Sequence, residues 1–177
     1  MRHRAMWLAP VLAGILTACA VDPSYPLLAA PGASQFSPTA LGAPVRGVVL
    51  YLEIRPGDTV ELVSAAALGV APGADVTTYF SPPITSADGS TLIGQRLEPL
   101  EGATIAISPT STPGPANEVA IVAEITARKP GRYSVTGIRV TFSLNGGSPE
   151  TKEGITQYLT VCADDPAPAT CDETPPP

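Results

Sequence analysis

The side chains best able to do chemistry in this chain of 177 residues are three cysteine thiols. Cys19 stands at the end of an apolar run near the amino terminus, and Cys162 and Cys171 stand near the carboxyl terminus. A thiol can be acylated or joined to a second thiol as a disulfide, and disulfides persist in exported proteins. The fate of Cys19 therefore decides how the other two cysteines are interpreted.

The amino-terminal segment has the features of an export signal. Arg2 and Arg4 precede an uncharged apolar run from Ala5 to Leu16, which is shorter than the roughly 20 residues that span a bilayer. Leu16-Thr17-Ala18-Cys19 resembles the lipobox of bacterial lipoproteins. The resemblance implies cleavage of residues 1–18 and a diacylglycerol on the Cys19 sulfur, which anchors the protein in a membrane. The alternative is an ordinary signal peptide that is cut elsewhere.

Cleavage before Cys19 would remove every histidine, tryptophan and methionine. These residues are Met1, His3, Met6 and Trp7. Without histidine, neither a Ser-His nor a Cys-His pair can form, and histidine-ligated metal sites are excluded as well. Motifs for nucleotide binding, a serine nucleophile or an EF-hand are also missing from the sequence. We therefore expect no catalytic residue, no metal and no cofactor.

Once Cys19 is acylated, Cys162 and Cys171 remain as a pair, and we expect a disulfide between them. Because nothing apolar between them offers a docking face, the bond is expected to tie back the tail rather than stabilise a core. The alternative is an intermolecular bridge through Cys171.

The charge of the chain argues against nucleic acid as a partner. The formal net charge is −6, and loss of Arg2 and Arg4 makes it more negative, whereas binding to phosphates requires clustered basic residues. A small basic cluster, Arg128, Lys129 and Arg132, could contact an anionic partner or could be a solvated turn. The apolar segment from Ala65 to Pro72 is either an interaction patch or a buried strand end.

Carboxylates are the remaining candidates for catalysis. Glu98 with Glu101, or Glu150 with Glu153, could in principle act as the two acids of a glycosidase. Solvated surface charges are the simpler interpretation.

The composition divides the mature chain into three parts. Residues 19–44 are rich in proline and are expected to form a tether, although Leu27-Leu28 or Phe36 could instead pack on the domain as a first strand. Residues 45–163 carry the folded domain. Residues 164–177 are acidic and rich in proline, which is typical of a disordered tail.

Apolar and polar residues alternate through the segment 45–163, as in half-buried strands. The expected strands cover 48–54, 60–62, 75–80, 119–126, 132–144 and 155–161, with weaker candidates at 91–97 and 103–107. In the first of these, Val48, Leu50, Leu52 and Ile54 would share one face. The pattern changes face at Gly137, which predicts a bulge. Because no helical period is sustained after the signal, we predict an all-β fold, an antiparallel β-sandwich of about seven to eight strands.

One motif narrows the type of sandwich. Pro130-Gly131-Arg132-Tyr133-Ser134-Val135 resembles the tyrosine corner of immunoglobulin-like domains, where a tyrosine near the start of strand F bonds to nearby backbone. Tyr133 matches that tyrosine, and Val135 stands where antibody domains have a core cysteine. The resemblance implies an immunoglobulin-like fold, although the core cysteine pair and the tryptophan are missing. Alternatively, Tyr133 is simply a strand aromatic.

Taken together, the sequence predicts a lipid-anchored binding or structural module on the extracytoplasmic face of the cell membrane, or on the outer membrane of a Gram-negative cell. Its partners would be membrane lipid, through acylated Cys19, and a protein of the envelope. The alternatives are an accessory subunit of a transporter or cell-wall complex, and a hydrolase that uses carboxylates alone.

Overall fold

The computed structural model describes residues 27–29, 35–82, 84–85, 91–92, 97–100, 102–106 and 117–171. Within these residues the chain forms strands and no helix, and it therefore contains no helix that could span a membrane. The predicted signal segment, Cys19 and residues 172–177 lie outside the described residues.

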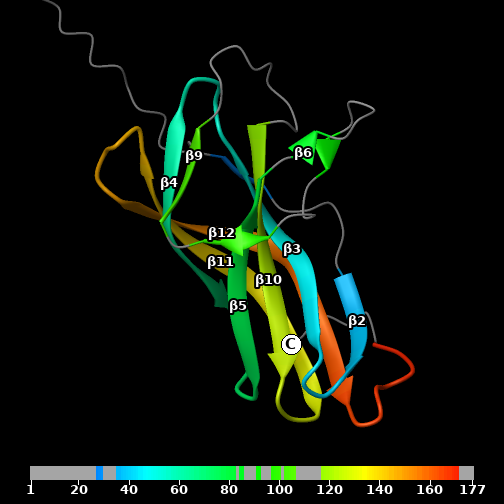
Figure 1. Cartoon of the computed structure of the whole chain (residues 1–177). Helices are drawn as coiled ribbons and strands as arrows, with labels where there is room; N and C mark the ends of the chain where they lie inside the picture. The colour runs from blue at the N-terminus through cyan, green and yellow to red at the C-terminus, as the bar shows by residue number, and fades with distance from the viewer. Residues whose placement is uncertain are drawn as a thin grey trace, which may run out of the picture.

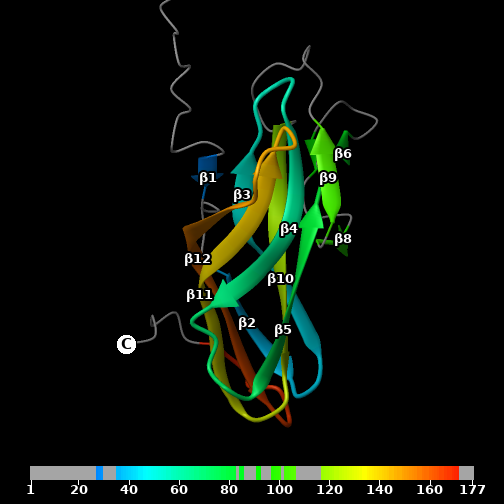
Figure 2. The ribbon, with the colours of Figure 1, turned by 90° about the vertical axis from the view of Figure 1, so that its left-hand side faces the viewer.

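Two sheets face each other across the core (Figures 1 and 2). The first sheet has the order β1 (Leu27–Ala29), β3 (Pro44–Glu53), β10 (Glu118–Ala127), β5 (Ala74–Ser81) and β8 (Glu98–Pro99). The second sheet has the order β2 (Gln35–Ala40), β12 (Glu150–Asp164), β11 (Gly131–Leu144), β4 (Thr59–Leu68) and β9 (Ala103–Ala106). A small separate pair consists of β6 (Ile84–Thr85) and β7 (Thr91–Leu92).

The strand order is that of an immunoglobulin-like sandwich. Taken in chain order, β1, β3, β4, β5, β10, β11 and β12 correspond to strands A to G. Their arrangement, A-B-E-D in one sheet and C-F-G in the other, is the constant-type topology. The remaining short strands are additions at the edges. The predicted all-β sandwich is thus confirmed.

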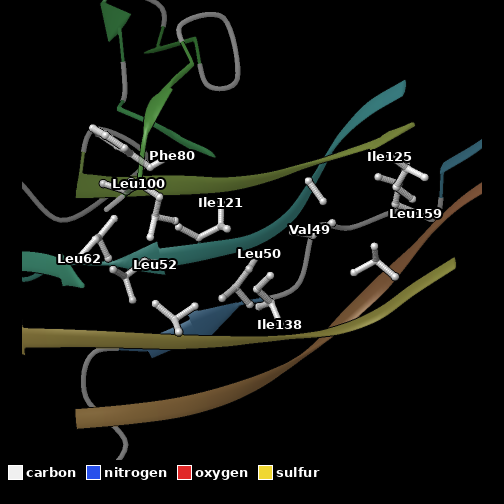
Figure 3. Close-up of a cluster of buried hydrophobic side chains, with 14 of the residues drawn as sticks. Val49, Leu50, Leu52, Leu62, Phe80, Leu100, Ile121, Ile125, Ile138 and Leu159 are labelled. Carbon is white, nitrogen blue, oxygen red and sulfur yellow. The ribbon is translucent and has the colours of Figure 1, made fainter. Parts of the chain in front are cut away.

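The core lies between the sheets and consists of aliphatic side chains with few aromatics (Figure 3). Leu50, Leu52 and Ile54 of the β3 region are fully buried, as the alternation predicts. Val48 was expected on the same face but is only half-buried, while Val49 is fully buried. The reason is a bulge opposite Ile121 and Val122, which adds a residue at Val49 and reverses the faces before it.

The bulge that the sequence predicts at Gly137 is confirmed. The register between β11 and β12 shifts between Val135 and Gly137, so that Val135 and Ile138 are both fully buried despite their odd spacing. Between these two pairs β11 has one residue, Thr136, whereas β12 has three, so the extra residues belong to β12. The Thr136 hydroxyl lies 3.4 Å from the carbonyl oxygen of Leu68.

The expected tether is too long, because part of it belongs to the sandwich. β1 pairs with β3, and β2 pairs with β12, in agreement with the alternative that this region supplies a first strand. The β2–β12 pair is parallel, so the antiparallel prediction is wrong at this edge. Pro38 does not prevent the pairing, since an edge strand tolerates a missing N–H on its outer side.

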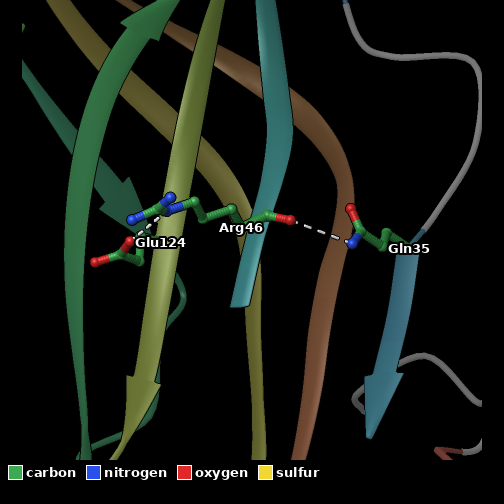
Figure 4. A network of polar contacts seen from close by, with 3 residues as sticks. All are labelled: Gln35, Arg46 and Glu124. Atoms are coloured by element: carbon green, nitrogen blue, oxygen red, sulfur yellow. Dashed lines mark hydrogen bonds and ion pairs between the residues drawn. The ribbon is translucent and has the colours of Figure 1, made fainter. Parts of the chain in front are cut away.

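A polar chain connects β2 to the first sheet (Figure 4). Gln35 Nε2 donates to the carbonyl oxygen of Arg46, 3.2 Å away, and the Arg46 guanidinium forms an ion pair with Glu124 on β10. The Arg46 side chain is 56% exposed, so the ion pair adds little stability. The Gln35 hydrogen bond joins the first residue of β2 to β3.

Candidate functional site

On one side of the sandwich, the short edge strands β9 and β8 cover only part of their neighbours β4 and β5. β9 pairs with β4 only along Thr59–Leu62, whereas β11 pairs with β4 as far as Leu68. β8 pairs with β5 only at Tyr79 and Phe80. Among the residues that the structure describes, 63–68 of β4 and 74–78 of β5 therefore have a strand neighbour on one side only. Figure 2 looks onto this side of the molecule.

A groove runs between these two edges, and we call it the β4/β5 groove. It consists of two adjoining hollows of about 520 and 460 Å³ that share Ala65, Val76 and Thr78. The Thr78 hydroxyl donates to the carbonyl oxygen of Ala65 at 3.0 Å, which links the two sheets between the hollows. The remaining lining residues are Val63, Ser64, Ala66, Ala67, Val70, Ala71, Pro72, Ala74, Thr77, Tyr79, Pro99 and Leu100.

The groove is lined by uncharged and mostly small side chains. Ala65, Ala67, Ala74 and Val76 pack against the edge of the core and are half-buried, while Ala66 is exposed on the opposite face of β4. The segment Ala65–Pro72, expected to be a patch or a buried strand end, is therefore the end of β4 and a turn, and it forms much of the groove wall. Such a surface suits apolar contact rather than bond-making chemistry.

Backbone contacts close the groove at both ends. At one end the chain crosses from β8 to β9, and Gly102 N–H donates to the Leu62 carbonyl at 2.9 Å. At the other end is the turn between β4 and β5. Arg128 N–H donates to the Gly73 carbonyl at 2.8 Å, so this turn is held to the turn between β10 and β11.

The side chain of Tyr133 packs against the turn between β4 and β5, which forms the second end of the groove. Its side chain is 4% exposed, and its hydroxyl donates to the Lys129 carbonyl at 3.0 Å, which is the contact of a tyrosine corner. Gly73, with φ of 114°, lies against the ring so closely that a Cβ there would be 2.8 Å from the hydroxyl oxygen. The predicted corner residue is therefore also part of the floor beneath the turn.

The basic residues singled out by the sequence do not all lie together. Arg128 and Lys129 are exposed in the turn that contacts Gly73, at this end of the groove. Arg128 forms an ion pair with Asp75 of β5 at 2.6 Å, and both side chains are more than 60% exposed. Arg132 alternates with the inward-facing Tyr133, so its side chain leaves from the outer face of the second sheet.

The disulfide between Cys162 and Cys171 is present, with a Cα–Cα distance of 5.4 Å, as predicted. It lies at the end of β12, and β12 is separated from β4 by β11. The bond therefore has no direct part in the groove.

The carboxylates do not form a catalytic pair in the described residues. Glu150 and Glu153 are three residues apart on one regular strand, so their side chains leave from opposite faces. Glu153 forms an ion pair with Arg139 at 2.7 Å. Glu98 lies in β8, and Glu101 is outside the described residues. The same described part of the chain holds no group of three side chains that could bind a metal ion.

Sequence reasoning missed the groove as a whole, because it depends on where β8 and β9 stop pairing. The signal that the sequence carried was the apolar segment from Ala65 to Pro72, which forms much of the groove wall.

No family model and no curated protein matches this chain. Among solved structures it is similar to the Ambient Temperature Fimbriae adhesin AtfE of Proteus mirabilis, with 9% sequence identity and a TM-score of 0.31. The match covers 77% of this chain and 100% of the adhesin chain. At this TM-score the likeness supports no conclusion about function, and the fold assignment rests on the strand order given above.

Proposed function

We propose that this protein is a lipid-anchored binding or structural module on the extracytoplasmic face of a bacterial cell envelope. The observation that carries the proposal is the sequence Leu16-Thr17-Ala18-Cys19 at the end of the apolar segment. The disulfide between Cys162 and Cys171 supports it, because such bonds persist mainly outside the cytoplasm.

Binding rather than catalysis fits the described surface best. The β4/β5 groove offers alanine, valine and threonine side chains, together with strand edges that have a neighbour on one side only. These groups can pack against a partner and exchange backbone hydrogen bonds. The proposed partners are therefore membrane lipid, held through acylated Cys19, and a protein of the envelope.

Lipid attachment can be tested in cells supplied with an alkyne fatty acid. Wild-type protein should carry the label and begin at Cys19, whereas Cys19→Ala should carry none. Label that persists on Cys19→Ala, or a purified wild-type protein that still begins at Met1, would contradict the proposed anchor.

A second candidate function is that of an accessory subunit in a transporter or cell-wall complex. The same groove favours it, because an open strand edge is suited to a protein partner. Cross-linking in intact cells, followed by isolation of the protein from solubilised envelope, distinguishes an accessory subunit from an independent module. A stable stoichiometric complex would favour the subunit, and recovery of the protein alone would favour an independent module.

A further inference from the structure

We propose that the β4/β5 groove binds an extended segment of a partner protein, which adds to the second sheet as a strand antiparallel to β4. The inference rests on the proposed binding function and names the kind of partner. The segment would continue the line of β9 along the half of β4 that β9 leaves open. It would carry aliphatic side chains at alternate positions and an acidic residue at its amino-terminal end.

The backbone of β4 offers hydrogen-bonding groups to such a segment. The Ala65 carbonyl accepts from the Thr78 side chain of the opposite sheet, so it points towards the open edge rather than towards β11. Alternate residues of a strand direct their backbone groups to the same side, so Ala67 also presents its N–H and C=O to that edge. Leu62, on the preceding stretch, already uses its outward carbonyl to accept from Gly102.

The side chains of the groove set the type of residue that enters it. An added strand would direct every second side chain between the sheets, into the hollows of about 520 and 460 Å³. The alanines at 65, 67 and 74 leave this space open, and Val76 forms an apolar wall. Aliphatic side chains of intermediate size would fill it and remove apolar surface from water.

The side chains of residues 63–68 lack the usual protection against strand addition. Edge strands commonly carry charges or proline on the exposed side, whereas Val63 to Leu68 contains neither. The uncharged edge also adds no like-charge repulsion against an acidic partner segment.

Charge complementarity sets the type of residue at the amino-terminal end of the partner segment. β4 ends at Leu68, next to the turn that contacts the basic turn of Arg128 and Lys129. A strand antiparallel to β4 begins at this end, so its amino-terminal residues would lie beside these cations. An aspartate or glutamate there would be attracted to them, and salt would weaken the attraction.

A second copy of this chain fits the groove less well. Symmetric pairing of two β4 edges would direct only Ala65 and Ala67 of each copy towards the hollows. These side chains are too small to fill the space, so an aliphatic segment from another protein is the occupant that the shape favours.

The test selects peptides on the full mature protein, purified in detergent. A phage library of random twelve-residue peptides is panned on wild type, with counter-selection on Ala65→Trp, in which the indole fills the shared part of the hollows. Ala40→Trp is the matched control, since Ala40 is exposed on β2, at the edge of the second sheet that lies away from the groove. We expect selected peptides with aliphatic residues at every second position and an acidic residue at the amino-terminal end.

Affinity and amide exchange then test the geometry with synthetic copies of the selected peptides. Ala65→Trp should weaken binding about tenfold or more, and Ala40→Trp should change it less than about twofold. Lys129→Glu should weaken binding about three- to fivefold at low salt, and a lysine at the amino end of the peptide should restore it. In wild type, bound peptide should slow hydrogen exchange in the segment 63–68.

Several results would overturn the proposal. These are an absence of selected peptides, sequences without alternating aliphatic residues, equal binding to Ala65→Trp, or unchanged exchange in 63–68. A wild-type dimer that Ala65→Trp abolishes would show that a second copy is the occupant. The hydrogen-exchange measurement needs only wild-type protein. It therefore tests peptide binding at 63–68 even if a variant fails to fold. Fatty-acid labelling of Cys19 is independent of all these results, so loss of this proposal leaves the proposed anchor standing.

Discussion

Tyr133 connects its own strand and the preceding turn to the distant turn between β4 and β5. Its hydroxyl holds the Lys129 carbonyl, its ring lies against Gly73, and its own strand enters the core through the fully buried Val135. The turn between β4 and β5 therefore packs on a side chain of another strand. At the residue scale, this contact is the support for one end of the β4/β5 groove.

Replacing Tyr133 with phenylalanine should remove the hydroxyl and leave the ring. The Lys129 carbonyl would lose this hydrogen bond, and because Lys129 itself is exposed, the free energy of unfolding should fall by about 0.5–1.5 kcal/mol, the net value of a typical hydrogen bond. Urea denaturation measures the change. Tyr79→Phe, at a half-buried strand position, is the control, and an equal loss in both variants would contradict a special role for the corner.

Two glycines with positive φ provide a matched comparison. A Cβ at Gly73 would lie 2.8 Å from the Tyr133 hydroxyl, whereas a Cβ at Gly42 would have no neighbour within 4 Å. Both alanine variants place a Cβ on a residue with positive φ, which destabilises the fold. Only Gly73→Ala adds a steric clash, with the Tyr133 hydroxyl. It should be less stable than Gly42→Ala by at least about 1 kcal/mol, and equal denaturation midpoints would count against the described packing.

At the scale of elements, the sequence predicted the strands that supply the core and, as a weaker candidate, β9 at one edge. It offered β1 and β2 only as an alternative to the tether. The alternating patterns correspond to β3, β4, β5, β10, β11 and β12, because a buried face imposes the period of two. For β2 the sequence favoured a tether, with Phe36 in a first strand as the alternative, because edge pairing needs no buried stripe and tolerates Pro38. The groove could not be predicted, since it is defined by where β8 and β9 stop, and that depends on contacts between distant segments.

The end of β12 provides a prediction about the disulfide. The loop between Cys162 and Cys171 is mostly exposed, so the bond joins a segment that packs little on the core. Replacing both cysteines with serine should cost no more than roughly 2–3 kcal/mol, the value for closing so short a loop. Thermal unfolding measures the loss, and a larger loss would mean that the loop contributes to the core.

The same bond can be checked by the mass of the unreduced protein. A monomer two hydrogens lighter than its reduced form is expected. Two free thiols, or a covalent dimer linked through Cys171, would exclude the intramolecular disulfide.

At the scale of the whole molecule, the two sheets are stable only together, because each covers the apolar face of the other. Val140 on β11 is fully buried between them. Val140→Asp should unfold the domain, since an unpaired carboxylate there costs several kcal/mol against a typical total stability of about 5–15 kcal/mol.

Thr141→Asp is the control for that variant, because Thr141 is only half-buried on the opposite face and contacts Thr151 at 2.9 Å. Circular dichroism should show a folded Thr141→Asp and an unfolded Val140→Asp. A folded Val140→Asp with an unchanged melting temperature would mean that the facing of β11 is wrong.

The parallel pairing of β2 with β12 also has a consequence for the order in which the chain can fold. A ribosome completes β2 long before it reaches Asp164, the last residue of β12. Until then β2 has no partner, and the edge of the second sheet cannot form. A sandwich with contacts between such distant segments is expected to fold slowly and late in synthesis. Such a chain remains extended while it is made, which is the state in which a polypeptide can be threaded through a narrow channel.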